Sequence, residues 1–401
     1  MHVGLWCIQG SGHLYPMGAL GRELMARGHE VTCFQDLRAR GMLKAAGVRW
    51  APIGTAAPWR PHAGEFATPG LMLHQAKCVL DEGTTAAKAA GVDAFVVDQC
   101  DLAAGSVADR LGLPFVNVSF FPPVFLDDST PPHTVGWGSG DGRHARRRNR
   151  GANRALVRAV GGVIQLVNRQ RAAWNLPPHN SLNDFFSSRA IVAQLPECLE
   201  LPRPRPPHLY YTGPFLDGRG RHHVWFPWEA LDGRPIVYAT LGTVRNRAVE
   251  VFHTIAAACS VLPVQLILSL GGFFEPNELP TLPGSPIVVQ YAPQLELLSA
   301  ASICITHAGL NTTLEALTHG VPLVAVPITD DQPGVAARIR RARVGRVVPL
   351  RRLTVDRLTA AVDALLSDRR YREAAGRVRA HIAAANGLTR AADIIEVVVR
   401  S

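Results

Sequence analysis

Short apolar runs alternate with segments of helical period through the first half of the chain. Four of the runs have the length and pattern of strands: His2–Cys7, Glu30–Phe34, Ala94–Val97 and Phe115–Val118. Two segments have the spacing of helices: Met17–Arg27, which Gly28 is well placed to end, and Leu102–Leu111. Strands that alternate with helices pair in parallel through crossover connections, so we expect an α/β fold.

The second half of the chain repeats this plan. Five continuous apolar runs are typical of strands covered on both faces: Pro235–Thr240, Val264–Ser269, Ile287–Gln290, Ile303–Thr306 and Leu323–Val326. Residues 217–234 are rich in Gly, Arg, His and Trp and lack periodicity, which is typical of a linker. We therefore expect an N-terminal domain over 1–216, a linker over 217–234, a C-terminal domain over 235–385, and a final helix within 386–401 after the Asn386-Gly387 break.

Composition excludes a mostly disordered chain, since 47% of the 401 residues are apolar and 18% are charged. The net charge is +10, but almost all of the basic residues are Arg scattered along the chain. Basic recognition motifs with interleaved aromatic residues are missing, so we expect no nucleic-acid partner. The seven Cys are odd in number, form no CxxC pair and mostly lie in apolar runs. This usage predicts free thiols in a reducing, cytoplasmic compartment.

One segment of the chain concentrates basic charge. Residues 143–158 read RHARRRNRGANRALVR. One interpretation is a solvated loop and helix start. The other is peripheral contact with a membrane surface, in which the following apolar segment Ala155–Val167 lies in the headgroup layer beside the Arg side chains. No apolar run reaches the ~18 residues needed to span a bilayer.

A first candidate site follows the first predicted strand, where the chain reads Gly10-Ser-Gly-His13-Leu-Tyr-Pro16. The dinucleotide pattern GxGxxG fails at Tyr15, although Asp36 after the second strand keeps that alternative open. We expect a glycine turn over 10–12 and place His13 in a strand-to-helix loop. Such loops lie at the carboxyl edge of a parallel sheet, where ligands bind.

Asp98 is the candidate partner of His13 because it ends the strand Ala94–Val97 and so reaches the same edge. A carboxylate there can accept the Nδ1–H of the imidazole, fix its tautomer and stabilise the imidazolium formed when Nε2 takes a proton. Asp101 is the rival carboxylate, but its position favours capping of the helix that starts at Leu102.

A second candidate site follows the strand Ile303–Thr306. His307 ends that strand, Gly309 permits a tight turn, and Asn311 and Thr312 open a helix whose N-terminus attracts anions such as a diphosphate. Glu315 has two interpretations: a capping-box partner of Thr312, or a bidentate acceptor for two ribose hydroxyls.

Two further segments fit around this anion site. Thr243 follows the strand Ile236–Thr240 and could donate to phosphate. Asp331 and Gln332 follow the strand Leu323–Val326. A carboxylate next to a carboxamide suits the binding of sugar hydroxyls, and a solvated acidic turn is the alternative.

Together these residues resemble the UDP-glycosyltransferase family. Its C-terminal signature, aromatic-Ala-Pro-Gln, then His-x-Gly-x-Asn-(Ser/Thr)-x-x-Glu, then Asp-Gln, is matched here by Tyr291–Gln294, His307–Glu315 and Asp331-Gln332. Tyr238–Thr243 and Asp331–Arg338 are similar to bacterial zeaxanthin glucosyltransferases and macrolide glycosyltransferases. The resemblance implies the GT-B fold, in which two Rossmann-like domains with parallel sheets face each other across a cleft and a final helix crosses back onto the first domain.

The resemblance also implies roles for single residues. His13 is the expected general base, with Asp98 as its orienting partner. Tyr291 would stack on uracil beside Ala292, Gln294 would contact the ribose or base, and Glu315 would bind the ribose 2′- and 3′-hydroxyls. The diphosphate is expected to bind Thr243, His307, Gly309, Asn311 and Thr312, and the sugar hydroxyls Asp331 and Gln332. Family members that use deoxyribonucleotide donors often lack the glutamate, so its presence favours UDP, and glucose is the expected hexose.

The expected reaction is inverting transfer of a hexose to a hydroxyl group. No Asp-x-Asp occurs, so we expect no cofactor and no essential metal, with the helix N-terminus in place of the cation. Four aromatic residues after the strand Phe115–Val118 are candidates to line an apolar acceptor pocket for a carotenoid, polyphenol or macrolide: Phe120, Phe121, Phe125 and Trp137. Core packing is the alternative for the first two. The alternative functions are a nucleotide-sugar epimerase or hydrolase, and a non-catalytic nucleotide-sugar-binding protein.

Overall fold

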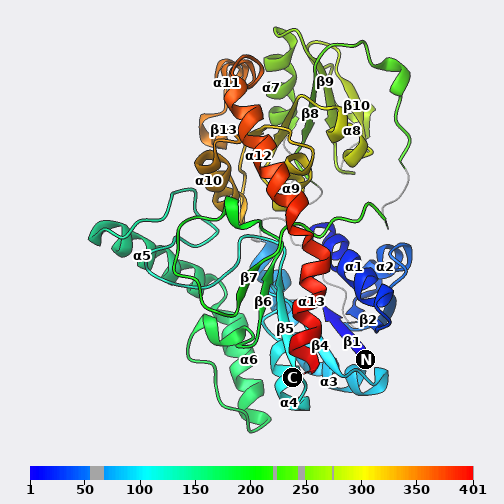
Figure 1. Ribbon diagram of the computed structural model, residues 1–401, viewed down its shortest axis with the longest axis vertical. Helices are drawn as coiled ribbons and strands as arrows, with labels where there is room; N and C mark the ends of the chain where they lie inside the picture. The colour runs from blue at the N-terminus through cyan, green and yellow to red at the C-terminus, as the bar shows by residue number, and fades with distance from the viewer. Residues whose placement is uncertain (55–66, 220–223, 243–248, 273–274, 401) are drawn as a thin grey trace.

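The computed structural model describes residues 1–54, 67–219, 224–242, 249–272 and 275–400. It contains two parallel sheets with helices on both faces, stacked along the long axis of the molecule (Figure 1). The N-terminal sheet has the order β3-β2-β1-β4-β5-β6-β7, and the C-terminal sheet the order β10-β9-β8-β11-β12-β13. Both orders reverse direction beside the first strand of the sheet, as in doubly wound nucleotide-binding folds.

The strands of the N-terminal sheet are β1 (His2–Trp6), β2 (Glu30–Gln35), β3 (Arg49–Pro52), β4 (Ala94–Asp98), β5 (Phe115–Ser119), β6 (Ile191–Ala193) and β7 (Leu209–Tyr211). Those of the C-terminal sheet are β8 (Ile236–Thr240), β9 (Gln265–Ser269), β10 (Ile287–Val289), β11 (Ile303–Thr306), β12 (Leu323–Ala325) and β13 (Gly345–Val347). Register pairs Trp6 with Val97 and Thr306 with Thr240, so the carboxyl ends of neighbouring central strands lie level with each other.

The helices that accompany the N-terminal sheet are α1 (Ser11–Ala26), α2 (Arg40–Ala45), α3 (Ala67–Ala90), α4 (Ala104–Leu111), α5 (Arg143–Ala159) and α6 (Gly161–Ala173). Those that follow are α7 (Val249–Ser260), α8 (Gln294–Ala300), α9 (Leu310–Thr318), α10 (Gln332–Ala342), α11 (Val355–Ser367), α12 (Arg369–Ala385) and α13 (Gly387–Arg400). The described helices include none that is both long and apolar enough to cross a membrane.

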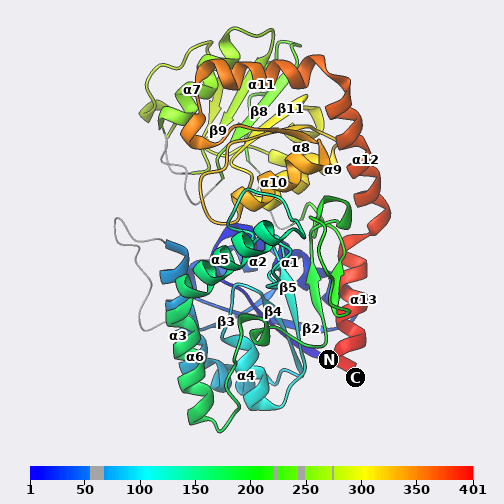
Figure 2. The same ribbon diagram turned by 90° about the vertical axis from the view of Figure 1, so that its left-hand side faces the viewer.

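The last helix returns to the first domain. Figure 2 shows α12 beside the C-terminal sheet and α13 continuing down to the N-terminal sheet, where the two chain ends lie close together. Ala391 and Ile395 of α13 share one buried cluster with Val3 and Leu5 of β1. Gly387 is needed at the crossing, because a Cβ there would lie 2.6 Å from the carbonyl oxygen of Pro214. Part of the expected linker, residues 220–223, lies outside the described residues.

The first helix begins earlier than the sequence pattern predicts. Gly10, with φ of 140°, makes the whole turn after β1, and its carbonyl accepts the N–H groups of His13 and Leu14 at 3.0 and 2.9 Å. The expectation of a glycine turn over 10–12 with His13 in a loop was wrong. The first N–H groups of a helix need no helical partner, so small residues at 11 and 12 enter the helix easily. His13 is therefore the third residue of α1 and is held rigidly.

Candidate active site

His13 and Asp98 meet at the carboxyl edge of the N-terminal sheet. Asp98 ends β4, which pairs directly with β1, and α1 starts just beyond β1. His13 Nδ1 lies 2.6 Å from Asp98 Oδ2, and Asp98 Oδ1 accepts the backbone N–H of Cys100 at 3.0 Å. The Asp98 side chain is fully buried and that of His13 is 21% exposed. The carboxylate therefore fixes the ring and leaves Nε2 as the reactive nitrogen.

Asp98 also sets the charge preference of this imidazole. Burial lowers the pKa of His13, but the charge and hydrogen bond of Asp98 outweigh burial, so that the pKa is raised above its ordinary value. The rival carboxylate Asp101 instead accepts the N–H groups of Ala103 and Ala104 at 3.0 Å each, as a helix cap. Asp36, which kept the dinucleotide alternative open, caps a short turn by accepting the N–H of Arg38 at 2.9 Å.

The four aromatic residues separate into two groups. The rings of Phe120 and Phe121 lie 5.8 and 6.4 Å from the His13 ring, and both side chains are buried. They form an apolar wall beside the imidazole and also pack into the core. Phe125 instead packs beside His208 at 6.2 Å, and the Trp137 indole donates to Asn149 of α5 at 2.9 Å. Neither of these two contacts involves His13.

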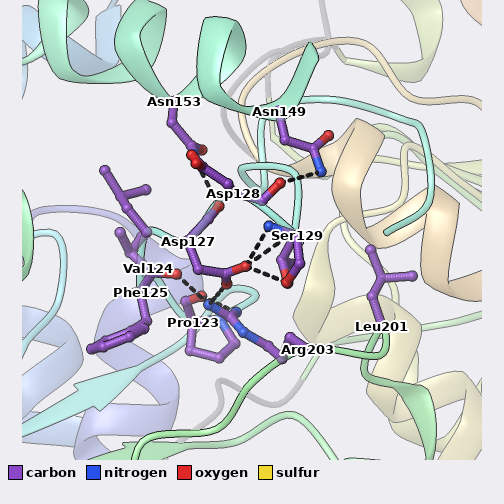
Figure 3. Close-up of polar contacts among 12 residues, drawn as sticks. Pro123, Val124, Phe125, Asp127, Asp128, Ser129, Asn149, Asn153, Leu201 and Arg203 are labelled. Atoms are coloured by element: carbon purple, nitrogen blue, oxygen red, sulfur yellow. Dashed lines mark hydrogen bonds and ion pairs between the residues drawn. The ribbon is translucent and has the colours of Figure 1, made fainter. Parts of the chain in front are cut away.

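The 123–130 loop, which carries Phe125, is held in place by polar contacts (Figure 3). Asp127 Oδ1 accepts the N–H groups of Ser129 and Thr130 at 2.8 Å each. Arg203 donates to the carbonyls of Pro123, at 3.2 Å, and of Phe125. Asn153 of α5 donates to the carbonyl of Asp127 at 2.8 Å. These contacts give the 123–130 loop a defined shape without regular secondary structure.

At the C-terminal sheet, His307 follows β11 and sits between two glycines. A Cβ on Gly242 would lie 2.7 Å from the His307 ring, and one on Gly309 would lie 2.5 Å from His307 Nε2. Burial lowers the pKa of His307 to about 4, so the ring is neutral at pH 7. A neutral imidazole has a single N–H, for which the backbone of Thr240 and a bound anion would compete.

The helix α9 begins at Leu310, with Gly309 as its N-cap and no side-chain cap. Thr312 is therefore inside the first turn and is not a cap, which removes the capping-box interpretation of Glu315. Glu315 is buried and accepts from Gln294 Nε2, and Gln294 Oε1 accepts from the Tyr238 hydroxyl at 2.9 Å. The hydrogen bond from Gln294 therefore holds the Glu315 carboxylate in one orientation near the start of α9.

Tyr291 is the most exposed of the predicted donor-site residues that the structure describes, with 47% of its surface open. It follows β10 and lies against Gly272, where a Cβ would lie 1.9 Å from the phenol oxygen. Ala292 packs against the buried core, and Gln294 is the first residue of α8. The exposed Tyr291 ring therefore lies just before α8, whose first residue, Gln294, is bonded to Glu315 of α9. Thr243 lies outside the described residues.

Asn311 joins the two sheets. Its Nδ2 donates to the carbonyl of Gly12 at 2.7 Å, and its Oδ1 accepts from Gln194 at 2.6 Å. Gly12 is open to this contact because Pro16, four residues later in α1, has no N–H to donate to it. The Asn311 side chain is thus committed to the domain interface. Sequence reasoning missed Gln194, whose signal is a polar residue directly after the apolar triplet Ile191–Ala193.

Asp331 and Gln332 start α10, Asp331 as N-cap and Gln332 as first residue. Burial raises the pKa of Asp331 to about 6, and the nearby charge of His13 acts against this rise. The two residues come from different domains, and the charge of Asp331 in turn helps to raise the pKa of His13. Gln332 Oε1 accepts the N–H groups of Ile328 and Thr329 at 2.8 and 2.9 Å, which leaves its NH₂ group for other partners.

One group of side chains in the described residues has the spacing of a metal site: His13, Asp98 and Cys100, with ligand atoms within 4.8 Å of one another. The chemistry fits a metal poorly. His13 and Asp98 are bonded to each other, and burial followed by the charge of Asp98 raises the pKa of the Cys100 thiol well above its ordinary value. A thiol that stays protonated at neutral pH is a weak ligand.

Comparison with known proteins agrees with this arrangement. Zeaxanthin glucosyltransferase of Pantoea ananas is 27% identical over 96% of this chain and 93% of its own length. Demethyllactenocin mycarosyltransferase of Streptomyces fradiae is 26% identical over 98% of this chain and 86% of its own length. The solved structure of the glycosyltransferase of kitacinnamycin superposes with a TM-score of 0.78 at 25% identity, covering 99% of this chain and 98% of that one.

These likenesses confirm the expected GT-B fold and the resemblance to zeaxanthin and macrolide glycosyltransferases. Residues 198–401 match the model of the family described as UDP-glucoronosyl and UDP-glucosyl transferase. That match spans the whole C-terminal sheet and all the predicted donor-site residues. The chain is therefore a glycosyltransferase and belongs to the UDP-glucoronosyl and UDP-glucosyl transferase family.

Proposed function

We propose that the protein moves a hexose, glucose first among candidates, from a UDP-sugar to a hydroxyl of an apolar small molecule, with inversion at the anomeric carbon. The observation that carries the proposal is the His13–Asp98 pair, with His13 Nδ1 2.6 Å from Asp98 Oδ2, whose imidazole also responds to the charge of Asp331 in the other domain. A base and a sugar-binding carboxylate would then serve the same reacting centre.

In the proposed reaction, His13 Nε2 takes the proton of an acceptor hydroxyl while that oxygen attacks the anomeric carbon. The bond to the diphosphate breaks on the opposite face, so an α-linked donor gives a β-glycoside and UDP. Asp98 stabilises the imidazolium that forms, through the hydrogen bond to Nδ1. General-base catalysis of this kind contributes roughly 10²–10⁴ in rate.

The leaving diphosphate gains negative charge, and the start of α9 is proposed to receive it. Unpaired N–H groups and the helix dipole at Leu310–Thr312 favour an anion there, and neutral His307 adds one donor. With these donors we propose that no metal and no cofactor are needed. Asp331 and the NH₂ group of Gln332 would hold sugar hydroxyls.

The donor base and ribose are proposed to bind between Tyr291 and Glu315. The exposed Tyr291 ring offers a stacking surface, and the Glu315 carboxylate, held by Gln294, offers acceptor oxygens for the ribose hydroxyls. Only a ribose has a 2′-hydroxyl, so we propose UDP over dTDP as the carrier. The acceptor would lie against Phe120 and Phe121, and the zeaxanthin named for the relative is an apolar, hydroxylated example.

The test is a UDP-release assay with UDP-glucose over a panel of apolar hydroxylated compounds. We expect release that depends on an acceptor and is lost in His13→Ala. UDP-sugar consumption without acceptor would instead favour an epimerase or hydrolase. Donor binding without turnover in the wild-type protein would favour a non-catalytic binding protein. Activity only on hydrophilic sugar acceptors would contradict the apolar acceptor class.

We also propose that the basic cluster contacts an anionic membrane surface through charge alone. Helices α5 and α6 contain no Asp or Glu. At about 100° per residue, six side chains of α5 fall within about 120° of its circumference: Arg143, Arg146, Arg147, Arg150, Arg154 and Arg158. Insertion of the apolar segment 155–167 is wrong, because Val163 and Val167 are buried and Leu156 and Ile164 pack against the core.

Sedimentation with vesicles tests this contact. Binding to vesicles of mixed zwitterionic and anionic lipid should fall by about tenfold or more in Arg146→Gln/Arg147→Gln/Arg150→Gln, since each Arg near such a surface adds to the attraction. The matched control removes three charges from the other domain: Arg341→Gln/Arg346→Gln/Arg351→Gln. Equal losses in both variants would mean that net charge alone acts, and no loss in either would mean that α5 is merely solvated.

A further inference from the structure

A buried ion pair crosses the interface between the two domains. Arg338 of α10 donates to Glu200 of the N-terminal domain, and the two side chains are only 3% and 5% exposed. Glu200 also accepts from the Tyr211 hydroxyl at 3.0 Å, and Arg338 Nη1 donates to the carbonyl of Gly334 at 3.0 Å. Buried pairs of this kind fix geometry more than they add stability.

The backbones of the two domains touch at the same place. A Cβ on Gly334 would lie 2.1 Å from the carbonyl oxygen of His133, so only glycine fits there. Gly334 and Arg338 are on the helix that Asp331 caps. Whatever holds this helix against the 123–133 loop therefore also sets where Asp331 and Gln332 lie relative to His13.

Next to Arg338 is a cavity of about 10 Å³ that the function proposed above does not use. Four of its lining residues carry a buried polar atom for which the described part of the chain offers no hydrogen-bond partner: Thr130 Oγ1, Asn153 Oδ1, Arg203 Nε and Arg338 Nε. The other polar atoms of these Asn and Arg side chains are bonded, for example Asn153 Nδ2 to Asp127 and Arg203 Nη1 to Pro123.

The size and charge of the cavity select its occupant. A volume near 10 Å³ accepts one water-sized molecule and excludes a phosphate or a sugar. Arg203 and Arg338 are matched by Asp127 and Glu200, so the surroundings are neutral and a further anion would be unpaired. Two N–H donors, one carbonyl-type acceptor and one hydroxyl match a water molecule, which accepts two hydrogen bonds and donates two.

We propose that this cavity binds one water molecule, and that the water and the Glu200–Arg338 pair form a polar joint that holds α10 in register with His13. Arg338 is then a positioning residue for the transfer reaction. Only the catalytic consequence of this joint depends on the proposed function. The binding of water rests on the cavity and its unpartnered atoms alone.

The first test is a high-resolution crystal structure of the wild-type protein, with a second crystal grown in bromide. We expect one isolated peak of density within about 3.2 Å of Arg203 Nε and Arg338 Nε, and no anomalous signal from bromide. An empty cavity or an anomalous peak overturns the proposal of a neutral occupant. This result is independent of whether the protein transfers a sugar.

The second test compares Arg338→Met with the control Arg341→Met, an exposed arginine of the same helix α10. We expect kcat of Arg338→Met to fall about 10–100-fold because misalignment slows the reaction. UDP affinity, measured by calorimetry, should change less than about twofold, and the pH midpoint of kcat/KM should stay. The control should keep wild-type kcat.

The single variant Arg338→Met leaves Glu200 unpaired, which could unfold the protein. A double variant tests the same role without this unpaired charge. Glu200→Gln/Arg338→Met leaves no unpaired buried charge and should fold while keeping the low kcat. Wild-type kcat in the single or the double variant overturns the positioning role. A loss of UDP affinity as large as the loss of kcat does so too, since Arg338 would then serve only the fold of its own domain.

Discussion

The protein places a histidine at the carboxyl edge of each of its two sheets, and the two have opposite properties. His13 follows β1 and His307 follows β11, each a central strand of its sheet. The pKa of His13 is raised because Asp98 outweighs burial, whereas burial lowers the pKa of His307 to about 4. Each histidine thus lies at the carboxyl edge of a central strand, and the neighbouring residues decide its chemistry.

The neighbours differ in a simple way. His13 has a buried carboxylate at 2.6 Å, which favours the protonated ring, and a phenylalanine wall that limits access of water. His307 lies against the backbone of two glycines, which leaves room for the ring but offers no charge in the described residues. The first environment suits a group that must take a proton, and the second a group that must donate a hydrogen bond while staying neutral.

The largest expected effect is the difference in kcat between variants that remove one or the other histidine. His13→Ala should lower kcat by about 10²–10⁴-fold, because the base is lost. His307→Ala should cost only about 10–100-fold, since it removes one hydrogen bond to a charged group. Steady-state kinetics with UDP-glucose and the best acceptor measure both. Equal losses in the two variants would contradict the division of roles.

The pH dependence sharpens the same comparison. A base must be unprotonated to act, so kcat/KM should rise with pH through the pKa of His13, with a midpoint above 6.5. Asp98→Asn should lower kcat by about 10²-fold or more and move the midpoint downward, because burial is then opposed only by the charge of Asp331. His307 should give no step above about pH 4. A midpoint that does not move in Asp98→Asn would show that another group titrates.

The glycines beside the two histidines should respond differently to an added methyl group. Gly309→Ala should destabilise the fold by about 1–3 kcal/mol, because the Cβ would overlap the His307 ring. Gly12→Ala should be nearly neutral, since its Cβ meets only Asn311 Nδ2, at 3.6 Å. Denaturant unfolding measures both changes. His307→Ala/Gly309→Ala should recover most of the loss, and no recovery would mean that the clash is not with His307.

The smallest expected effect concerns the contact that joins the two histidine sites. Pro16→Ala supplies an N–H to the carbonyl of Gly12, which competes with Asn311. One weakened hydrogen bond should lower kcat by about 2–10-fold while leaving UDP affinity unchanged. Asn311→Ala, which also loses the hydrogen bond from Gln194, should show at least this loss of kcat, and adding Pro16→Ala to it should lower kcat no further. Additive losses would mean that the two residues act separately.

The sequence was informative wherever a signal is local. The apolar runs predicted the central strands, because strands covered on both faces need continuous apolar residues. Asp98 at the end of its strand, and the ordered motif from Tyr291 to Gln332, predicted which residues gather at the sheet edges. Among the strands of three residues, β6, β7 and β13 escaped prediction, whereas β10 and β12 lie within the predicted apolar runs Ile287–Gln290 and Leu323–Val326.

What only the tertiary structure decided are the contacts between segments that are far apart in the chain. No local pattern says that Asn311 bonds Gly12, that Arg338 pairs with Glu200, or that Phe125 packs beside His208. The residues themselves, histidines included, are fixed by the sequence. The pKa values and hydrogen-bond partners of these residues are fixed by burial and by neighbouring charge, and both exist only once the chain has folded.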